Sequence, residues 1–197
     1  DAVTGITIMQ MDQGLDTGAI IDTVEVPIVD GDTSGTLIER LAIAGRDAIV
    51  AALSRLKREG SLASRPQPRD GATYARKIER AEAAIDWESD AETIDRQVRA
   101  FEPSPGAFTS LEGVPIKILR ARPLVRPAAS APGTVLDARS DGIEVACGRG
   151  ALRIFELQPA GKRRMNVEAF LAGHYLPTGA RFAPTPASPL ARPPDAA

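Results

Sequence analysis

The stretch from Thr4 to Gly18 constrains the fold of this chain more than any other part of the sequence. Ile6 to Met11 is an apolar run of the kind that forms strands, which predicts a buried strand. A tight acidic loop, Asp12 to Gly18, follows, and a second apolar run, Ala19 to Val26, comes directly after it. The pattern predicts two strands with the carboxylate of Asp16 at a strand end, where α/β enzymes usually place their chemistry.

A long amphipathic helix is predicted after these strands. Asp30 to Ser34 provide a turn and a helix cap, and Gly60 provides a stop. Between them, apolar residues recur every three or four positions: Leu37, Leu41, Ala44, Ala48, Ala52 and Leu56. Strand, loop, strand and helix make the closing portion of an open α/β sheet whose other strands are absent. We therefore interpret the chain, which lacks an initiator Met, as a fragment of a longer protein.

A second pattern begins beyond a linker at 61–72 that is rich in Pro and Gly. A short helix is predicted around Ala91 to Phe101, and alternating apolar runs separated by glycines then predict a small β-barrel. Another short helix is expected near Val167 to Ala172. The tail after Phe182 is rich in Pro and Ala and is predicted to be disordered.

Composition and charge limit the classes of function. The chain is 43% hydrophobic and 25% charged, as in soluble globular proteins, and no apolar run approaches the length of a membrane span. The single cysteine, Cys147, fits a reducing compartment. Residues 1–60 hold 5 basic and 10 acidic side chains, whereas residues 98–182 hold 12 and 7. The basic part is a candidate surface for phosphate, although modest imbalance of this kind is also common without a function.

Asp16 is the first candidate for chemistry. A carboxylate between small residues can orient a neighbouring imidazole or hold a reactive water. Asp-x-Gly is also a routine turn, and the spacing alone favours the turn. The lone His174 is interpreted as a surface or packing residue and Trp87 as a residue that packs the linker, and Met9, Met11 and Cys147 are interpreted as core.

A basic run, Gln158 to Met165, is the second candidate. Lys162, Arg163 and Arg164 follow a Pro-Gly turn, an arrangement suited to a phosphate backbone. A solvated basic loop is the alternative. A second cationic cluster contains Lys117, Arg120 and Arg122, and few aromatic residues interleave either cluster, so base stacking is not implied.

The Thr4–Gly18 run resembles the signature loop of the folate-dependent formyltransferases, and of the methionyl-tRNA formyltransferases in particular. Leu157 to Lys162 resembles the Leu-Gln-Pro-Ala-Gly-Lys motif in the C-terminal domain of that family. Shorter matching stretches lie between them in the same order: Asp32–Leu37, Thr73–Ile78, Ala84–Trp87, Arg99–Phe101 and Ala131–Val135. Glu102 departs from the pattern, because the family usually has Asn-Pro and a bulky aromatic there.

The resemblance implies an α/β remnant, the end of a Rossmann-like formyltransferase domain, followed by a small β-barrel like the oligonucleotide-binding (OB) fold. It places the catalytic remnant at 1–62, a linker and connecting helix at 63–97, the tRNA-binding barrel at 98–182 and a disordered tail at 183–197. The implied reaction moves a formyl group from 10-formyltetrahydrofolate, the folate co-substrate, to the α-amine of methionyl initiator tRNA.

The resemblance also assigns roles to residues. Asp16 is expected to be catalytic beside an Asn and a His that precede residue 1, and Asp12, Gly14 and Leu15 are expected to line the folate site. The expected tRNA contacts are Lys162, Arg163, Arg164, Lys117 and Arg120. No metal and no membrane are implied, and we expect a monomer in the bacterial cytoplasm or an organellar matrix. By itself the chain is expected to be inactive in formyl transfer.

Two alternatives remain. The chain could be a non-catalytic module that binds tRNA, or it could belong to a formyltransferase acting on an amino sugar nucleotide, which shares the Leu-Asp-x-Gly loop. The basic run and the predicted barrel weigh against the second alternative.

Overall fold

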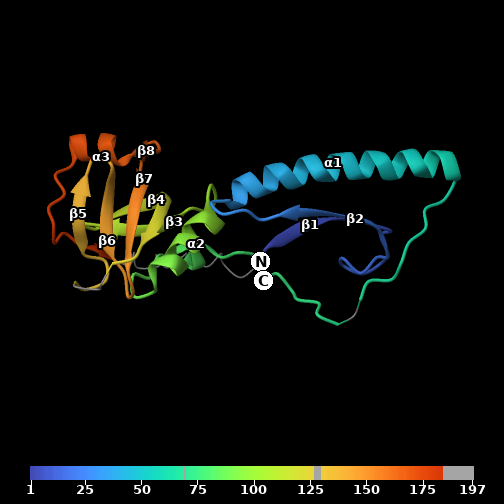
Figure 1. Cartoon of the computed structure of the whole chain (residues 1–197), viewed down its shortest axis with the longest axis horizontal. Coiled ribbons are helices and arrows are strands. Elements are labelled where there is room, and N and C mark those ends of the chain that lie inside the picture. Colours follow the sequence, from blue (N-terminus) through green and yellow to red (C-terminus); the bar gives the residue numbers. More distant parts are fainter. Residues whose placement is uncertain (69, 127–129, 184–197) are drawn as a thin grey trace, which may run out of the picture. The chain divides into compact units, whose positions relative to one another are not determined.

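The computed structural model describes residues 1–68, 70–126 and 130–183 (Figure 1). The chain divides into two compact units, unit 1 from Asp1 to Lys77 and unit 2 beginning at Ile78. Of the predicted tail, 184–197 lie outside the described residues, whereas Ala183 is paired with Ser110 in a short strand.

Unit 1 is an antiparallel hairpin covered by one helix. Strands β1 (Val3–Met9) and β2 (Ile20–Pro27) pair along their length, and helix α1 (Ser34–Glu59) packs along both (Figure 1). The helix approaches closely at Gly45, where an added Cβ would lie 3.7 Å from the Ile6 side chain. The two predicted strands and the long helix are therefore confirmed.

The ends of α1 follow the predicted caps. Thr33 is the N-cap, and its hydroxyl accepts a hydrogen bond from the Thr36 amide while Thr36 bonds back to the Thr33 amide. Gly60 ends the helix with φ 76°, a left-handed conformation that glycine adopts without strain. The carboxylate of Asp32 accepts hydrogen bonds from the Val29 amide, the Thr36 hydroxyl and the Arg40 guanidinium. These bonds lower the pKa of the Asp32 carboxyl, and the bond from the Val29 amide has the largest effect.

Burial in unit 1 differs from the prediction. Strand β1 is half-exposed rather than buried, it ends at Met9, and Met11 is 83% exposed rather than in a core. The apolar side chains buried among the described residues of unit 1 are Val26, Ala48 and Ala52. The reason is that a two-stranded hairpin with a single helix can bury only the side chains between them.

Unit 2 is built on a curled antiparallel sheet. Its strands are β3 (Ala107–Leu111), β4 (Val114–Leu124), β5 (Val135–Arg139), β6 (Gly142–Ala146), β7 (Ala151–Pro159), β8 (Met165–Asn166) and β9 (Phe182–Ala183). The order is β5-β6-β7-β4-β3-β9, and β8 pairs with β7. Helices α2 (Ala91–Phe101) and α3 (Val167–Gly173) and a 3₁₀ turn, η1 (Arg80–Ala83), complete the unit, so both predicted short helices are confirmed.

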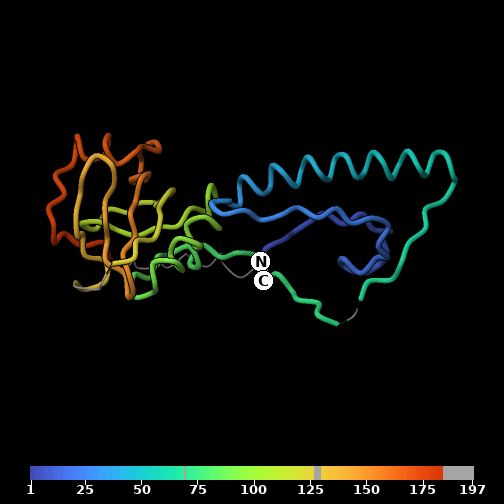
Figure 2. Tube along the Cα trace, in the orientation of Figure 1, coloured from blue at the N-terminus to red at the C-terminus, as the bar shows by residue number. Residues whose placement is uncertain are grey.

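Hydrogen bonds join the two ends of this sheet. The Val135 amide donates to the Ala180 carbonyl (2.8 Å), and the Phe182 amide donates to the Gly133 carbonyl (2.8 Å). These bonds connect the segment entering β5 with the segment entering β9. The trace in Figure 2 shows the resulting curl.

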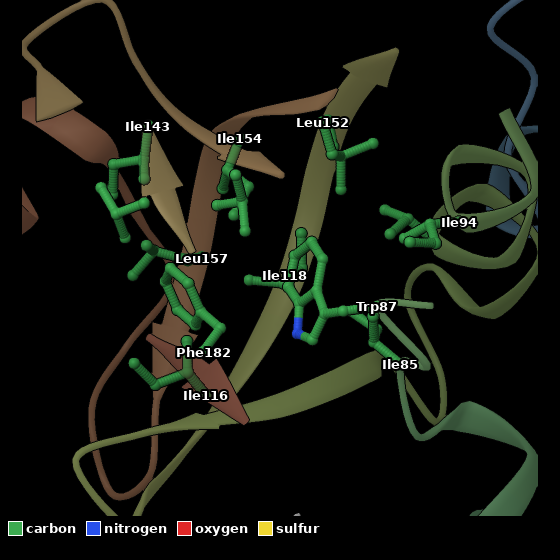
Figure 3. Close-up of a cluster of buried hydrophobic side chains, with 14 of the residues drawn as sticks. Ile85, Trp87, Ile94, Ile116, Ile118, Ile143, Leu152, Ile154, Leu157 and Phe182 are labelled. Carbon is green, nitrogen blue, oxygen red and sulfur yellow. The ribbon is translucent and has the colours of Figure 1, made fainter. Parts of the chain in front are cut away.

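The core of unit 2 fills the inside of the curled sheet. Ile118, Ile143, Leu152 and Ile154 are fully buried and converge with Phe182, as Figure 3 shows. Trp87 belongs to the same cluster, and its ring lies among these side chains in Figure 3. Its ring nitrogen donates to the Thr109 hydroxyl (3.0 Å) and its ring lies 5.7 Å from that of Phe182, which confirms its packing role. Cys147 is also buried, and burial raises the pKa of its thiol to about 12.

Candidate functional site

The acidic loop between β1 and β2 is held by its own first carboxylate. One oxygen of Asp12 accepts hydrogen bonds from the Gly14 amide (3.0 Å) and the Thr17 hydroxyl (2.6 Å). Gly14 is tightly placed, because an added Cβ would lie 2.1 Å from the Thr17 hydroxyl oxygen. Asp12 therefore shapes the loop, while Leu15 is 78% exposed at its tip.

Asp16 occupies the position with the most unusual backbone in this loop. Its φ is 55°, a left-handed conformation that aspartate adopts more readily than most residues. The side chain is exposed, and its carboxylate bonds no other residue in the described part of the chain. Such a carboxylate is available to a partner or substrate. The neighbouring Gly18 is buried, and a Cβ there would lie 1.9 Å from the Gln10 carbonyl oxygen, so only glycine fits.

Gln67, from the predicted linker, holds the far side of the same loop. Its side-chain amide nitrogen donates to the backbone carbonyls of Asp16 (2.8 Å) and Gly18 (2.7 Å). Arg65 exchanges two backbone hydrogen bonds with Ile20, which aligns this segment beside β2. Sequence reasoning missed Gln67, since nothing local links a linker glutamine to a loop 49 residues earlier.

The two predicted cationic clusters of unit 2 meet on one face of the β4–β7 pair. Lys117 pairs in register with Gln158, and Arg120 pairs with Glu156. The register shifts on both sides of Arg120, so that Ile118 and Leu119 are both buried while Arg120 stays exposed. The basic loop after β7 follows on the same strand, and the Gln158 side chain donates to the Lys162 carbonyl (2.8 Å).

Glu156 connects the clusters. One carboxylate oxygen accepts from Nε of Arg120 (2.7 Å) and the other from Nε of Arg164 (2.6 Å). Nη1 of Arg164 also donates to Glu102 (2.7 Å), and the Arg120 guanidinium lies 4.9 Å from the centre of the Phe155 ring. Burial raises the pKa of Glu156, but the bonds from the two arginines outweigh burial and lower it overall. The Glu156 bond raises the pKa of Arg164.

The remaining predicted contacts differ in their exposure. Lys162 and Arg163 are exposed and make no ion pair with any residue of the described ranges. Lys117 is half-buried, its side chain close to Gly106. Arg122 is exposed and lies opposite Arg153 in the β4–β7 register. The Arg153 side chain forms ion pairs with Asp141 and Glu144.

Other candidate centres are weaker. Nδ1 of His174 donates a hydrogen bond to the Phe170 carbonyl (3.1 Å), and its exposed ring stacks on the Phe170 ring, as expected for a surface or packing residue. Among residues 1–68, 70–126 and 130–183, no three potential ligands gather to hold a metal ion. Over the same part of the chain, no helix combines the length and apolar character that crossing a bilayer requires.

Comparisons with known proteins match both units to one family. Residues 1–53 match the model described as "Formyl transferase", and residues 77–175 match "Formyl transferase, C-terminal domain". The chain is 51% identical over 183 residues to the methionyl-tRNA formyltransferase of Burkholderia vietnamiensis and 52% identical over 183 residues to that of Burkholderia multivorans. Each alignment covers 93% of this chain and 56% of the relative, so the chain spans little more than half the length of these relatives.

Solved structures share the fold at low sequence identity. HypX from Aquifex aeolicus, solved with tetrahydrofolic acid, matches 87% of this chain and 30% of its own length, with a TM-score of 0.69 and 20% identity. An N-formyltransferase from Helicobacter canadensis, solved with folinic acid and dTDP-3-aminofucose, matches 84% of this chain and 57% of its own length, with a TM-score of 0.59 and 17% identity.

Proposed function

Because this chain belongs to the formyl transferase family, we propose that its protein transfers a formyl group from 10-formyltetrahydrofolate to the α-amine of methionyl initiator tRNA. The single observation that carries the choice of substrate is the identity of about half the residues to methionyl-tRNA formyltransferases over 93% of the chain. In this proposal residues 1–62 are the end of the Rossmann-like catalytic domain, 63–97 the linker and 98–182 an OB-like barrel. The bonds that join the ends of the sheet support the barrel.

Asp16 is the catalytic residue of the proposal. Transfer to an amine passes through a tetrahedral intermediate, which needs donors for the oxyanion and an acceptor for the amine proton. The Asp16 carboxylate is exposed and bonds no other described residue, so it can set the charge of an imidazole or take part in proton transfer. Gly14 and Leu15 beside it would line the folate site, with Asp12 fixing their backbone.

The basic face of β4 and β7 is the proposed tRNA surface. Five cations, Lys117, Arg120, Lys162, Arg163 and Arg164, gather on this face and the loop that follows it. Arg120 and Lys162 lie far apart in sequence, and their gathering supports attraction of a phosphate backbone over an ordinary solvated loop. The proposal further expects a monomer in the bacterial cytoplasm or an organellar matrix.

Formyl transfer by the native protein tests the catalytic part. The intact mass of that protein is measured first. A mass well above 20.8 kDa would show that the native chain has a further segment, which could carry the Asn and His that the proposal requires. We expect Asp16→Asn to reduce formylation of methionyl initiator tRNA by at least about a hundredfold. Asp47→Asn, on the exposed side of α1, is the matched control and should keep full activity. Equal activity of both variants would contradict a catalytic Asp16.

Competition separates the substrates. Initiator tRNA should compete for the protein, whereas a dTDP-amino sugar should not. The opposite result would favour the amino sugar nucleotide alternative.

Binding of initiator tRNA to the chain itself tests the other part. The logarithm of the association constant should fall linearly with the logarithm of salt concentration. Replacing Lys162 and Arg163 with Gln removes two charges and should reduce the magnitude of this slope by about two. Replacing Lys57 and Arg58 at the end of α1 removes the same charge from unit 1 and should leave the slope unchanged. Equal effects of both pairs would place the RNA elsewhere.

A further inference from the structure

The arrangement around Glu156 differs from that of an ordinary cationic patch. A patch that binds RNA by charge alone gains nothing from a carboxylate in its centre, because the carboxylate repels phosphate. Glu156 nevertheless lies between Arg120 and Arg164, with 23% of its side chain exposed, and uses both oxygens to bond them. It requires an explanation that net charge does not supply.

The bonds to Glu156 are made through one edge of each guanidinium. Arginine has five N–H donors in a planar fork, and Glu156 takes the Nε donor of both side chains. Among the described residues, the two amino groups of Arg120 bond nothing, and Arg164 uses only Nη1, toward Glu102. The donors that suit a phosphate therefore remain available on both arginines.

Other contacts fix the same two side chains. The Arg120 guanidinium lies over the Phe155 ring, and Glu102, at the end of α2, accepts a second bond from Arg164. The lowered pKa of Glu156 keeps its carboxylate ionised at neutral pH, so both bonds remain charge-assisted. Two long side chains that would otherwise sample many rotamers are thus held in one arrangement before any ligand arrives.

We propose that Glu156 is a positioning residue that holds Arg120 and Arg164 by their Nε edges, so that the amino groups left unbonded, both of Arg120 and Nη2 of Arg164, form one receptor for a phosphodiester of folded RNA. The inference rests on the proposed tRNA-binding function. A fixed receptor matches a phosphate in one place on a structured RNA, whereas a flexible polyanion can adapt to any cationic surface. Glu156 accordingly contributes selectivity rather than raw affinity.

The test measures a ratio of affinities. Binding of the full 197-residue chain to initiator tRNA and to polyuridine of the same length is measured at one salt concentration. We expect Glu156→Gln to reduce the preference for tRNA by about tenfold, from the loss of charge-assisted bonds at both arginines. Glu156→Asp keeps the charge but is too short to reach both Nε atoms, and it should reduce the preference as well.

Glu144→Gln is the matched control. Glu144 lies on β6 of the same sheet and bonds another pair of arginines, Arg126 and Arg153, so the substitution removes the same charge outside the proposed receptor. It should raise the affinity for both RNAs together and leave the preference unchanged. Urea unfolding of each variant ensures that only folded chains are compared.

Three outcomes would overturn the inference. If Glu156→Gln behaves as Glu144→Gln does, the carboxylate only repels phosphate. If Glu156→Asp keeps the full preference, charge and not placement matters. If the unmodified chain binds tRNA no better than polyuridine, the proposed tRNA-binding function fails and the inference fails with it.

Discussion

Unit 2 buries a continuous apolar cluster that draws on its strands and on α2 and α3, whereas unit 1 leaves much of α1 in solvent. Six apolar side chains of α1 are exposed: Ile38, Ile43, Ile49, Val50, Leu53 and Leu56. Stability comes from apolar area removed from water, so the two units differ in what maintains them. The proposed RNA surface lies on a unit with its own core, and the proposed catalytic loop lies on a unit held largely by backbone pairing and polar bonds.

Hydrogen exchange should show the largest difference between the units. We expect amides of β4 and β7 to exchange about a thousandfold more slowly than those of β1 and β2, equivalent to ~4 kcal/mol in opening free energy. Exchange is followed residue by residue by NMR in the full chain. Protection of residues 1–26 as strong as that of β4 and β7 would break the comparison.

Truncating a core side chain should affect only unit 2 strongly. Ile154→Ala removes a fully buried side chain and should lower the free energy of unfolding of unit 2 by about 2–5 kcal/mol in urea. Ile43→Ala is the matched substitution on α1, where the side chain is 55% exposed, and should cost less than about 0.5 kcal/mol. Similar costs at both sites would mean that the exposed face of α1 is covered in solution.

Two glycines test the same contrast through overpacking. A Cβ at Gly148 would lie 1.8 Å from the Glu88 carbonyl oxygen, and one at Gly18 would lie 1.9 Å from that of Gln10. Gly148→Ala should destabilise unit 2 by about 1–3 kcal/mol. Gly18→Ala should displace the acidic loop and leave the unfolding transition of unit 2 unchanged. Chemical shifts report the displacement of the loop, and urea unfolding reports the stability of unit 2. A loss of stability in unit 2 from Gly18→Ala would contradict the independence of the two units.

Gln67→Glu should loosen the acidic loop alone. A carboxylate cannot donate to the carbonyls of Asp16 and Gly18, so both bonds are lost with little change of shape. We expect amides of residues 12–18 to exchange about tenfold faster, corresponding to ~1.4 kcal/mol. Gln97→Glu, which removes a similar pair of bonds from the carbonyls of Glu82 and Ala84 in unit 2, is the control and should leave the loop unaffected.

Acid should produce the smallest effect, through Glu156. Its pKa is lower in the folded chain than the ordinary value of 4.5, so its ionised form stabilises the fold. This contribution is complete above about pH 5 and is lost as the pH falls through 4.5 to the folded pKa. The difference in unfolding free energy between the unmodified chain and Glu156→Gln should therefore shrink between pH 7 and pH 3. A difference that grows on acidification would mean that the pKa is raised.

Periodicity predicted the elements better than their burial. The helix at Ser34–Glu59 was predictable because its apolar spacing and both caps agree. The exposure of Met11 was not, since a strand pattern does not state which partners cover its end.

The candidate residues that the sequence could propose stand in local motifs, whereas the residues that position them come together only in the fold. Asp16 and Lys162 to Arg164 stand in contiguous motifs. Gln67 and Glu156 do not, because each acts on residues that only the fold brings near. The irregular register beside Arg120 is a further reason, since alternation along β4 does not predict which side that arginine faces.

The two bonds of Gln67 have a mechanical consequence. The chain leaves unit 1 through the segment that carries Gln67, next to the Arg65–Ile20 pairing. Tension along this segment would load the carbonyls of Asp16 and Gly18 directly, before any strand pair deeper in the hairpin had to open. The conformation of the acidic loop would then depend on the force carried by the connecting chain, because the same two hydrogen bonds link them.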